Sequence, residues 1–202
     1  SRPLIADAQR RDLEWLGLTW DKEVQPQSDR DYSAYLRQLQ PHTYYCVCTR
    51  AEIKASGGIY QGVCRTRGHS EGALRFALSS EHTPFHDRHF GLRDINPSQF
   101  GDPVLQRRDK VISYNLAVVT DDIRDGVTEV VRGADLLDYT AVQLRLYDAL
   151  SAHPPTWFHS PLVLGANGKK LSKSHASLHL QQLREAGWEP AHIWNLVLPW
   201  LG

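Results

Sequence analysis

Apolar residues recur at helical spacing in five stretches of the chain, and each stretch predicts an amphipathic helix. The five stretches are residues 3–18, 29–39, 139–150, 177–186 and 191–200. The apolar side of the first is formed by Leu4, Ala8, Leu13 and Leu16, and Gly17 ends it. We expect the second to begin at Ser28 or Asp29 and to bury Tyr32, Tyr35, Leu36 and Leu39.

Other stretches have the pattern of strands. Residues 74–78 alternate between apolar and polar. The run Tyr114–Val119 is continuously apolar, which is typical of a strand buried on both faces. Strands are also expected in the β-branched run 127–133 and in the run Trp157–Leu164. Residues 79–103 are rich in His, Pro, Asp and Gly and predict irregular structure with brief strands.

Strands and helices alternate in the second half of the chain. This order predicts an α/β fold in which a parallel sheet is connected by crossover helices. The chain has 202 residues, enough for one domain that carries an insertion.

The chain carries 23 basic and 23 acidic residues, so its formal net charge is zero. A broad nucleic-acid-coating surface would need a strongly cationic face, and the balance argues against one. Residues 107–110 and 65–67 are local basic clusters that could contact RNA over a small area. No apolar run approaches the length of a membrane span and no signal peptide is visible, so we expect a cytoplasmic protein.

The three cysteines lie close together as Cys46-x-Cys48-x15-Cys64. In a cytoplasmic chain this clustering favours a metal over disulfides, and zinc takes four ligands in a tetrahedron. Tyr60 and two histidines are the available fourth donors; ligand statistics favour a histidine, His42 or His69. The alternative is three reduced thiols packed as small apolar side chains.

A second histidine-rich stretch could also be read as a metal cluster. It contains His82, His86 and His89, but Pro84 interrupts any helix that would align them. We prefer a solvated loop there.

Residues 168–174 form a loop of cations and hydroxyls, Gly-Lys-Lys-Leu-Ser-Lys-Ser, shortly after the apolar run 162–164. Lysine is a mobile point charge and serine can donate to oxygen atoms, so the loop suits a polyphosphate. A solvated surface loop is the alternative.

Arg132 follows a predicted buried strand, within Arg132-Gly-Ala-Asp135. Ligands of open α/β sheets bind beyond the carboxyl ends of the strands, where an arginine can grip a carboxylate. Tyr114, expected at the mouth of the neighbouring strand, could add a hydroxyl. A structural Arg132–Asp135 pair that caps the next helix is the alternative.

Several motifs in one order resemble the glutamyl-queuosine tRNA(Asp) synthetases, the short paralogues of bacterial glutamyl-tRNA synthetase. The resemblance covers nearly the whole chain. Its motifs are residues 15–21, 46–50, 57–65, 114–119, 131–135 and 170–174.

The resemblance implies a Rossmann-like class I synthetase catalytic domain with a parallel sheet, a zinc-bearing insertion and C-terminal helices. Residues 1–40 and 111–175 would form the catalytic domain, 41–110 the insertion and 176–202 the helices. It also implies roles for individual residues. One structural Zn²⁺ would be bound by Cys46, Cys48, Tyr60 and Cys64. L-glutamate would be bound by Tyr114 and Arg132. ATP would be bound by Lys170, Ser172 and Lys173, of which Lys173 would be catalytic.

The implied reaction activates L-glutamate with ATP and Mg²⁺. It then transfers the glutamyl group to queuosine in the anticodon stem-loop of tRNA(Asp), by a protein expected to be a monomer. Two alternatives are the catalytic core of an ordinary glutamyl-tRNA synthetase, which charges the tRNA 3′ end, and a catalytically decayed zinc-containing RNA-binding module. The family pattern begins with a strand and a HIGH-type motif that these residues do not include. We therefore expect the 202 residues alone to activate glutamate poorly.

Overall fold

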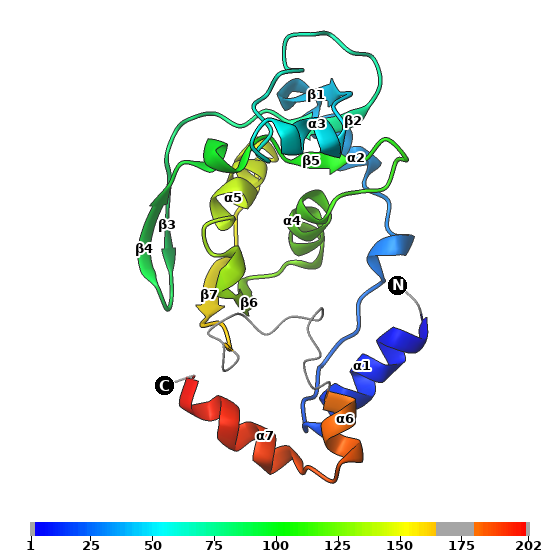
Figure 1. The fold of residues 1–202 in the computed structure, drawn as a ribbon, viewed down its shortest axis with the longest axis vertical. Coiled ribbons are helices and arrows are strands. Elements are labelled where there is room, and N and C mark those ends of the chain that lie inside the picture. The colour runs from blue at the N-terminus through cyan, green and yellow to red at the C-terminus, as the bar shows by residue number, and fades with distance from the viewer. Residues whose placement is uncertain (1–2, 165–179, 201–202) are drawn as a thin grey trace. The chain divides into compact units, whose positions relative to one another are not determined.

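The computed structural model describes residues 3–164 and 180–200, and the chain divides into two compact units (Figure 1). The larger unit comprises residues 31–160, and the smaller comprises residues 1–30 and 161–202. Among the described residues, no helix is both long and apolar enough to cross a membrane. The predicted division into a split catalytic domain, an insertion and C-terminal helices stays a prediction.

The smaller unit is helical in its described part. Its helices are α1 (Pro3–Trp15), η1 (Gln27–Asp29), α6 (Leu180–Glu185), α7 (Pro190–Val197) and η5 (Leu198–Trp200). An ion pair between Arg184 and Asp12, 3.1 Å long, joins α6 to α1. The indole nitrogen of Trp194 donates to the carbonyl oxygen of Leu16 at 3.0 Å. The helices expected near residues 3–18, 177–186 and 191–200 are therefore present in the described residues, and the first ends at Trp15, earlier than predicted.

The larger unit contains two sheets. One has the order β1-β2-β5 and is antiparallel, and the other has the order β4-β3-β7-β6. In the second sheet β7 runs parallel to both β3 and β6, whereas β3 and β4 form an antiparallel hairpin. The strands are β1 (Thr43–Cys46), β2 (Ala73–Phe76), β3 (Thr83–Asp87), β4 (Gly91–Ile95), β5 (Val104–Gln106), β6 (Glu129–Gly133) and β7 (Thr156–Ser160).

The helices of the larger unit are α2 (Ser33–Leu39), α3 (Arg50–Ala55), α4 (Tyr114–Asp125) and α5 (Thr140–Ala149), with short turns η2 (Gln40–His42), η3 (Pro97–Phe100) and η4 (Ala134–Leu136). Two of them pack against these strands, α4 against β5 and α5 against β3. Helix α5 connects the parallel strands β6 and β7 and packs against α4 and β3 (Figure 1). The predicted α/β class with a parallel sheet and crossover helix is confirmed.

The predicted strand at Tyr114–Val119 is wrong, because this run begins helix α4. The Ser113 side chain caps the helix by accepting from the amide of Leu116, and Gly126 ends it with a left-handed φ of 68°. Leu116, Ala117 and Val119 bury the apolar face. A continuous apolar run cannot distinguish a buried strand from a buried helix, and the caps on both sides decide the outcome here.

The second predicted helix starts later than expected. Residues 27–29 form a separate 3₁₀ turn, and α2 begins at Ser33, whose amide donates to the Asp31 carboxylate at 2.9 Å. The predicted buried stripe is nevertheless correct, since Tyr32 and Leu39 are buried while Tyr35 and Leu36 pack against the same core. The predicted strand at Trp157–Leu164 ends at Ser160.

Candidate functional site

The three cysteine side chains meet at one point. Their sulfur atoms lie within 4.8 Å of one another, and Cys46 and Cys64 are buried. Cys46 ends β1, and Cys48 directly precedes Thr49, which opens α3 with a capping box formed with Glu52. Gly72 is also required, because its φ is 137° and a Cβ there would lie 2.5 Å from the Cys46 carbonyl oxygen.

Tyr60 is packed in the same cluster. Its ring is buried with Cys46 and Cys64, and its phenol oxygen accepts a hydrogen bond from the Cys64 amide at 2.9 Å. Within the described residues, neither His42 nor His69 joins the three sulfurs. Three thiols therefore meet at this point with one phenol beside them, and three thiolates are a donor group that a tetrahedral zinc ion binds.

A second layer of polar contacts holds the tyrosine end of the cluster. Asp102 is almost fully buried; its carboxylate accepts from Tyr44 and Arg65 and from the Leu78 amide. The guanidinium of Arg75 lies 3.9 Å from the centre of the Tyr60 ring. Outer contacts of this kind fix the orientation of ligands in metal sites.

The thiols are not equivalent electrostatically. Burial opposes ionisation of Cys64, but hydrogen bonds from Tyr60, the Val47 amide and the other two thiols outweigh it and lower the pKa of Cys64 to about 6. Burial and hydrogen bonding to Cys64 raise the pKa of Cys48 to about 11. Cys64 is thus better prepared than Cys48 to act as a thiolate ligand.

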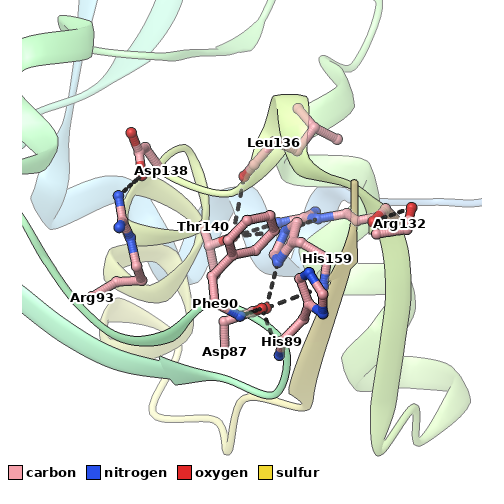
Figure 2. A network of polar contacts seen from close by, with 10 residues as sticks. Asp87, His89, Phe90, Arg93, Arg132, Leu136, Asp138, Thr140 and His159 are labelled. Atoms are coloured by element: carbon pink, nitrogen blue, oxygen red, sulfur yellow. Dashed lines mark hydrogen bonds and ion pairs between the residues drawn. The ribbon is translucent and has the colours of Figure 1, made fainter. Parts of the chain in front are cut away.

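Arg132 lies near the end of β6, in a network of polar contacts shown in Figure 2. Its Nε donates to Nε2 of His159 at 3.0 Å, and one terminal nitrogen donates to the hydroxyl of Thr140 at 2.8 Å. Nδ1 of His159 lies 2.6 Å from the carboxylate of Asp87. Asp87, Thr140 and His159 are fully buried, so the arginine is supported from within the protein.

Tyr114 is the first residue of α4 and is 53% exposed. It is close enough to Arg132 to influence the charge of that side chain. Burial lowers the pKa of Arg132, while Tyr114, Asp122 and Tyr147 partly oppose this shift. The two residues that the sequence proposed for one ligand are therefore neighbours, although Tyr114 begins a helix rather than ending a strand.

The sequence model of one family of catalytic domains matches most of this chain. The family is described as tRNA synthetases class I (E and Q), catalytic domain, and its match covers residues 63–199. The chain belongs to this family.

Relatives of this synthetase-family chain carry a more specific name. It is 44% identical over 168 residues to the glutamyl-Q tRNA(Asp) synthetase of Vibrio parahaemolyticus, covering 79% of this chain and 56% of that protein. It is 40% identical over 225 residues to the enzyme of the same name from Nitratidesulfovibrio vulgaris, covering 96% of this chain and 69% of that protein. The chain therefore spans between about half and two thirds of these relatives.

A solved structure supports the class I synthetase fold. A glutamate tRNA ligase from Elizabethkingia meningosepticum, crystallised with its amino acid, superposes with a TM-score of 0.73 at 25% identity. The match covers 92% of this chain and 44% of that one.

Two further groups of residues were considered from the sequence, the ATP-binding candidates and the histidine-rich stretch. Lys170, Ser172 and Lys173 lie outside the described residues. His82 pairs with Asp94 at 3.2 Å, and the ring of His89 meets that of Phe90 edge to face. The predicted loop is wrong for His86, which is an exposed residue of strand β3. Among the described residues, the three histidines form no group that could hold a metal ion.

Sequence reasoning missed His159, Asp87 and Thr140. His159 lies in the middle of a predicted buried strand, and a polar residue there is unusual enough to mark a position with a buried partner. Asp87 falls in a stretch expected to be irregular, and nothing local connects it with a residue 72 positions later.

Proposed function

We propose that the protein containing this chain activates L-glutamate with ATP and transfers the glutamyl group to queuosine in the anticodon of tRNA(Asp). The observation that carries the proposal is Arg132, whose guanidinium is held by the buried His159 and Thr140 and whose pKa Tyr114, at the start of α4, helps to raise. The names of the relatives and the resemblance of motifs supply the specific substrate.

Arg132 offers a planar, permanently charged fork that suits a carboxylate of glutamate. Its Nε is occupied by His159 and one terminal nitrogen by Thr140, which fixes the plane of the guanidinium. Tyr114 adds a hydroxyl that can donate to or accept from the amino acid. Together they would hold glutamate so that a carboxylate oxygen can reach ATP.

The chemistry has two balanced steps. A glutamate carboxylate oxygen attacks the α-phosphorus of ATP, and pyrophosphate leaves, giving glutamyl-adenylate. A hydroxyl of the cyclopentenediol of queuosine then attacks the carbonyl carbon, and AMP leaves. Lys173, with Lys170 and Ser172, would stabilise the negative charge that builds on the phosphates, and Mg²⁺ bound with ATP would supply further charge neutralisation. Loss of Lys173 should cost about 3–4 kcal/mol of transition-state stabilisation, the value of one oxyanion donor.

One zinc ion on Cys46, Cys48, Tyr60 and Cys64 would have a structural role. It would join the end of β1, the start of α3 and the segment around residues 60–64, which are too short to build a core of their own. We further propose that the protein works as a cytoplasmic monomer.

The test uses the full-length natural protein in two assays. Glutamate-dependent ATP–pyrophosphate exchange without tRNA measures activation, and charging of tRNA(Asp) with and without queuosine measures transfer. We expect exchange without tRNA and charging only of the queuosine-containing tRNA. Charging of queuosine-free tRNA(Glu) would favour an ordinary glutamyl-tRNA synthetase, and RNA binding without exchange would favour a decayed module.

A further inference from the structure

A cavity of about 740 Å³ in the larger unit is lined by Cys48 of the cysteine cluster and by Tyr114, and no ligand has been assigned to it above. Its wall is formed by the start of α3, strand β2 and the turn that precedes α4, and Tyr114 lies at its edge. The charged residues that line it are Arg50, Arg75, Arg107, Arg108 and Asp109. Asp109 pairs with Arg107 at 2.8 Å, so the wall keeps a strong positive charge.

Arg75 is the most informative of these residues because it is 8% exposed. One terminal nitrogen donates to the backbone oxygen of Asp102 at 2.5 Å, while the Asp102 carboxylate is paired with Arg65. Within the described part of the chain, Nε of Arg75 has no hydrogen-bond partner, and no carboxylate forms an ion pair with this arginine. The ring of Tyr60, 3.9 Å from the guanidinium, offsets part of the cost of burying this charge, and an anionic ligand in the cavity that Arg75 lines would offset more of it.

We propose that this arginine-lined cavity binds phosphodiester groups of the RNA substrate, next to the residue that contacts glutamate. Arginine suits phosphate because its donors form a planar fork, and apolar side chains such as Ile53, Val111 and Ile112 in the same wall suit a ribose or a base. The cavity opens beside Tyr114, so a strand held there would lie close to the glutamyl group. The inference rests on the proposed function, since it assigns the surface that receives the tRNA.

The first experiment measures binding of a fluorescent anticodon stem-loop RNA to this chain over a range of salt concentrations. Arg50→Ala and Arg107→Ala should each weaken binding about fivefold to tenfold and reduce the salt slope by about one, as expected for lost phosphate contacts. Arg88→Ala removes an exposed arginine that lies outside the cavity and is ion-paired with Glu129, as Arg107 is with Asp109, so it is the charge-matched control and should change binding less than twofold. An equal loss in all three variants would overturn the proposal.

A second arm separates RNA from free polyphosphate, which offers the same chemistry. ATP or pyrophosphate at millimolar concentration could bind the wild-type protein but not Arg50→Ala, while RNA binds both proteins equally. That result would make the cavity a polyphosphate site, and the proposal would fail. In the full-length protein, Arg50→Ala and Arg107→Ala should retain tRNA-independent ATP–pyrophosphate exchange. Both should lose transfer of the glutamyl group to the tRNA. Absence of exchange in wild type would refute the proposed function, whereas the RNA-binding result would still decide this inference.

A separate observation concerns how Arg132 is oriented. Arg132 can only donate, so Nε2 of His159 must accept, and the ring proton must lie on Nδ1, which faces the Asp87 carboxylate at 2.6 Å (Figure 2). The carboxylate of Asp87 is itself held in place by hydrogen bonds that it accepts from the backbone amides of His89, Phe90 and His159. The chain Asp87–His159–Arg132 is therefore polarised in one direction.

The geometry points to His159 as a positioning residue for Arg132. The buried carboxylate selects the ring tautomer, and the tautomer presents the one acceptor that fixes the guanidinium plane. This too rests on the proposed role of Arg132 in binding glutamate.

The test compares two substitutions of His159 in the full-length protein. His159→Phe removes the acceptor and should raise the KM for glutamate about tenfold to a hundredfold, the factor of one hydrogen bond to a charged group, with a smaller effect on the KM for ATP. His159→Gln can place an oxygen near the position of Nε2 and should recover part of the loss. Arg132→Lys is the reference for loss of the fork.

If both His159 variants bind glutamate as wild type does while Arg132→Lys does not, the positioning role is refuted and the proposed function stands. If Arg132→Lys also binds normally, the proposed glutamate site is refuted. A spectroscopic readout is independent of activity: ¹⁵N NMR of this chain should show His159 as the neutral Nδ1–H tautomer, and an Nε2–H signal would overturn the inference.

Discussion

The phenol oxygen of Tyr60 accepts a hydrogen bond from the backbone amide of Cys64 at 2.9 Å. This bond holds the phenol oxygen beside the cysteine cluster. The same tyrosine carries the guanidinium of Arg75 on its ring. Tyr60 thus connects the proposed zinc site with the proposed phosphate-binding cavity, and its substitution separates the contributions of its oxygen and its ring.

Tyr60→Phe keeps the ring and removes the oxygen. We expect about one zinc ion per chain in wild type and at least a tenfold weaker affinity in the variant, because one of four donors is lost. Elemental analysis and competition with a chromophoric chelator measure these quantities. Tyr45→Phe, which changes the residue before Cys46 in β1, is the control. Equal affinities would return the fourth position to another donor.

Asp102→Asn should destabilise the protein by about 1–3 kcal/mol. The substitution removes a buried charge that accepts from Tyr44, Arg65 and the Leu78 amide, but Arg65 is partly exposed and water can replace part of the interaction. Urea denaturation measures the change. Asp109→Asn, which removes an exposed carboxylate, should cost less than about 0.5 kcal/mol. Similar costs for the two variants would contradict a structural role of the buried network.

Gly126→Ala should destabilise the protein by about 1 kcal/mol, because Gly126 ends α4 with a φ of 68° that a Cβ disfavours. Gly126→Asn is the matched control, since asparagine tolerates the left-handed region, and it should cost clearly less. Thermal or urea unfolding distinguishes the two. A stability of the alanine variant equal to wild type would show that this backbone conformation is not needed.

Asp122 should make stability depend on pH. Burial raises the pKa of its carboxyl to about 6, despite the opposing effects of Tyr147 and Arg132. Since the folded-state pKa is above the unfolded one, this group's contribution is fully present below about pH 4 and is lost as the pH rises through about 6. Asp122→Asn should therefore flatten the fall in unfolding free energy between those values, and Asp125→Asn should not. An unchanged profile in Asp122→Asn would exclude the shift.

The parts of the site that depend on local pattern were accessible from the sequence. Cys46, Cys48 and Cys64 fall within one short stretch, so their spacing alone suggested a common point. Arg132 was selected as a candidate because it follows a β-branched run, and β6 is indeed a strand. Tyr114 was also selected as a candidate, but its predicted element was wrong, since the caps at Ser113 and Gly126 outweighed a pattern that fits either structure.

Long-range pairing explains what could not be predicted. The contact between Asp87 and His159 exists because β3 and β7 become parallel neighbours, with Asp87 paired in register to Trp157. No sequence pattern near either residue encodes that register. Likewise, Arg75 appeared as one residue of an alternating strand, and only the packing of Tyr60 and Asp102 around it reveals a buried cation.

The short turn between β5 and α4 has an evolutionary consequence. Gln106 ends the strand and Tyr114 begins the helix, so the seven intervening residues set the angle at which the tyrosine leaves the helix axis. One inserted or deleted residue that shifted the helical start would rotate this side chain by about 100° and carry its hydroxyl away from Arg132. We therefore expect lineages to keep the length of this turn, together with its capping Ser113 and the proposed phosphate-binding Arg107 and Arg108.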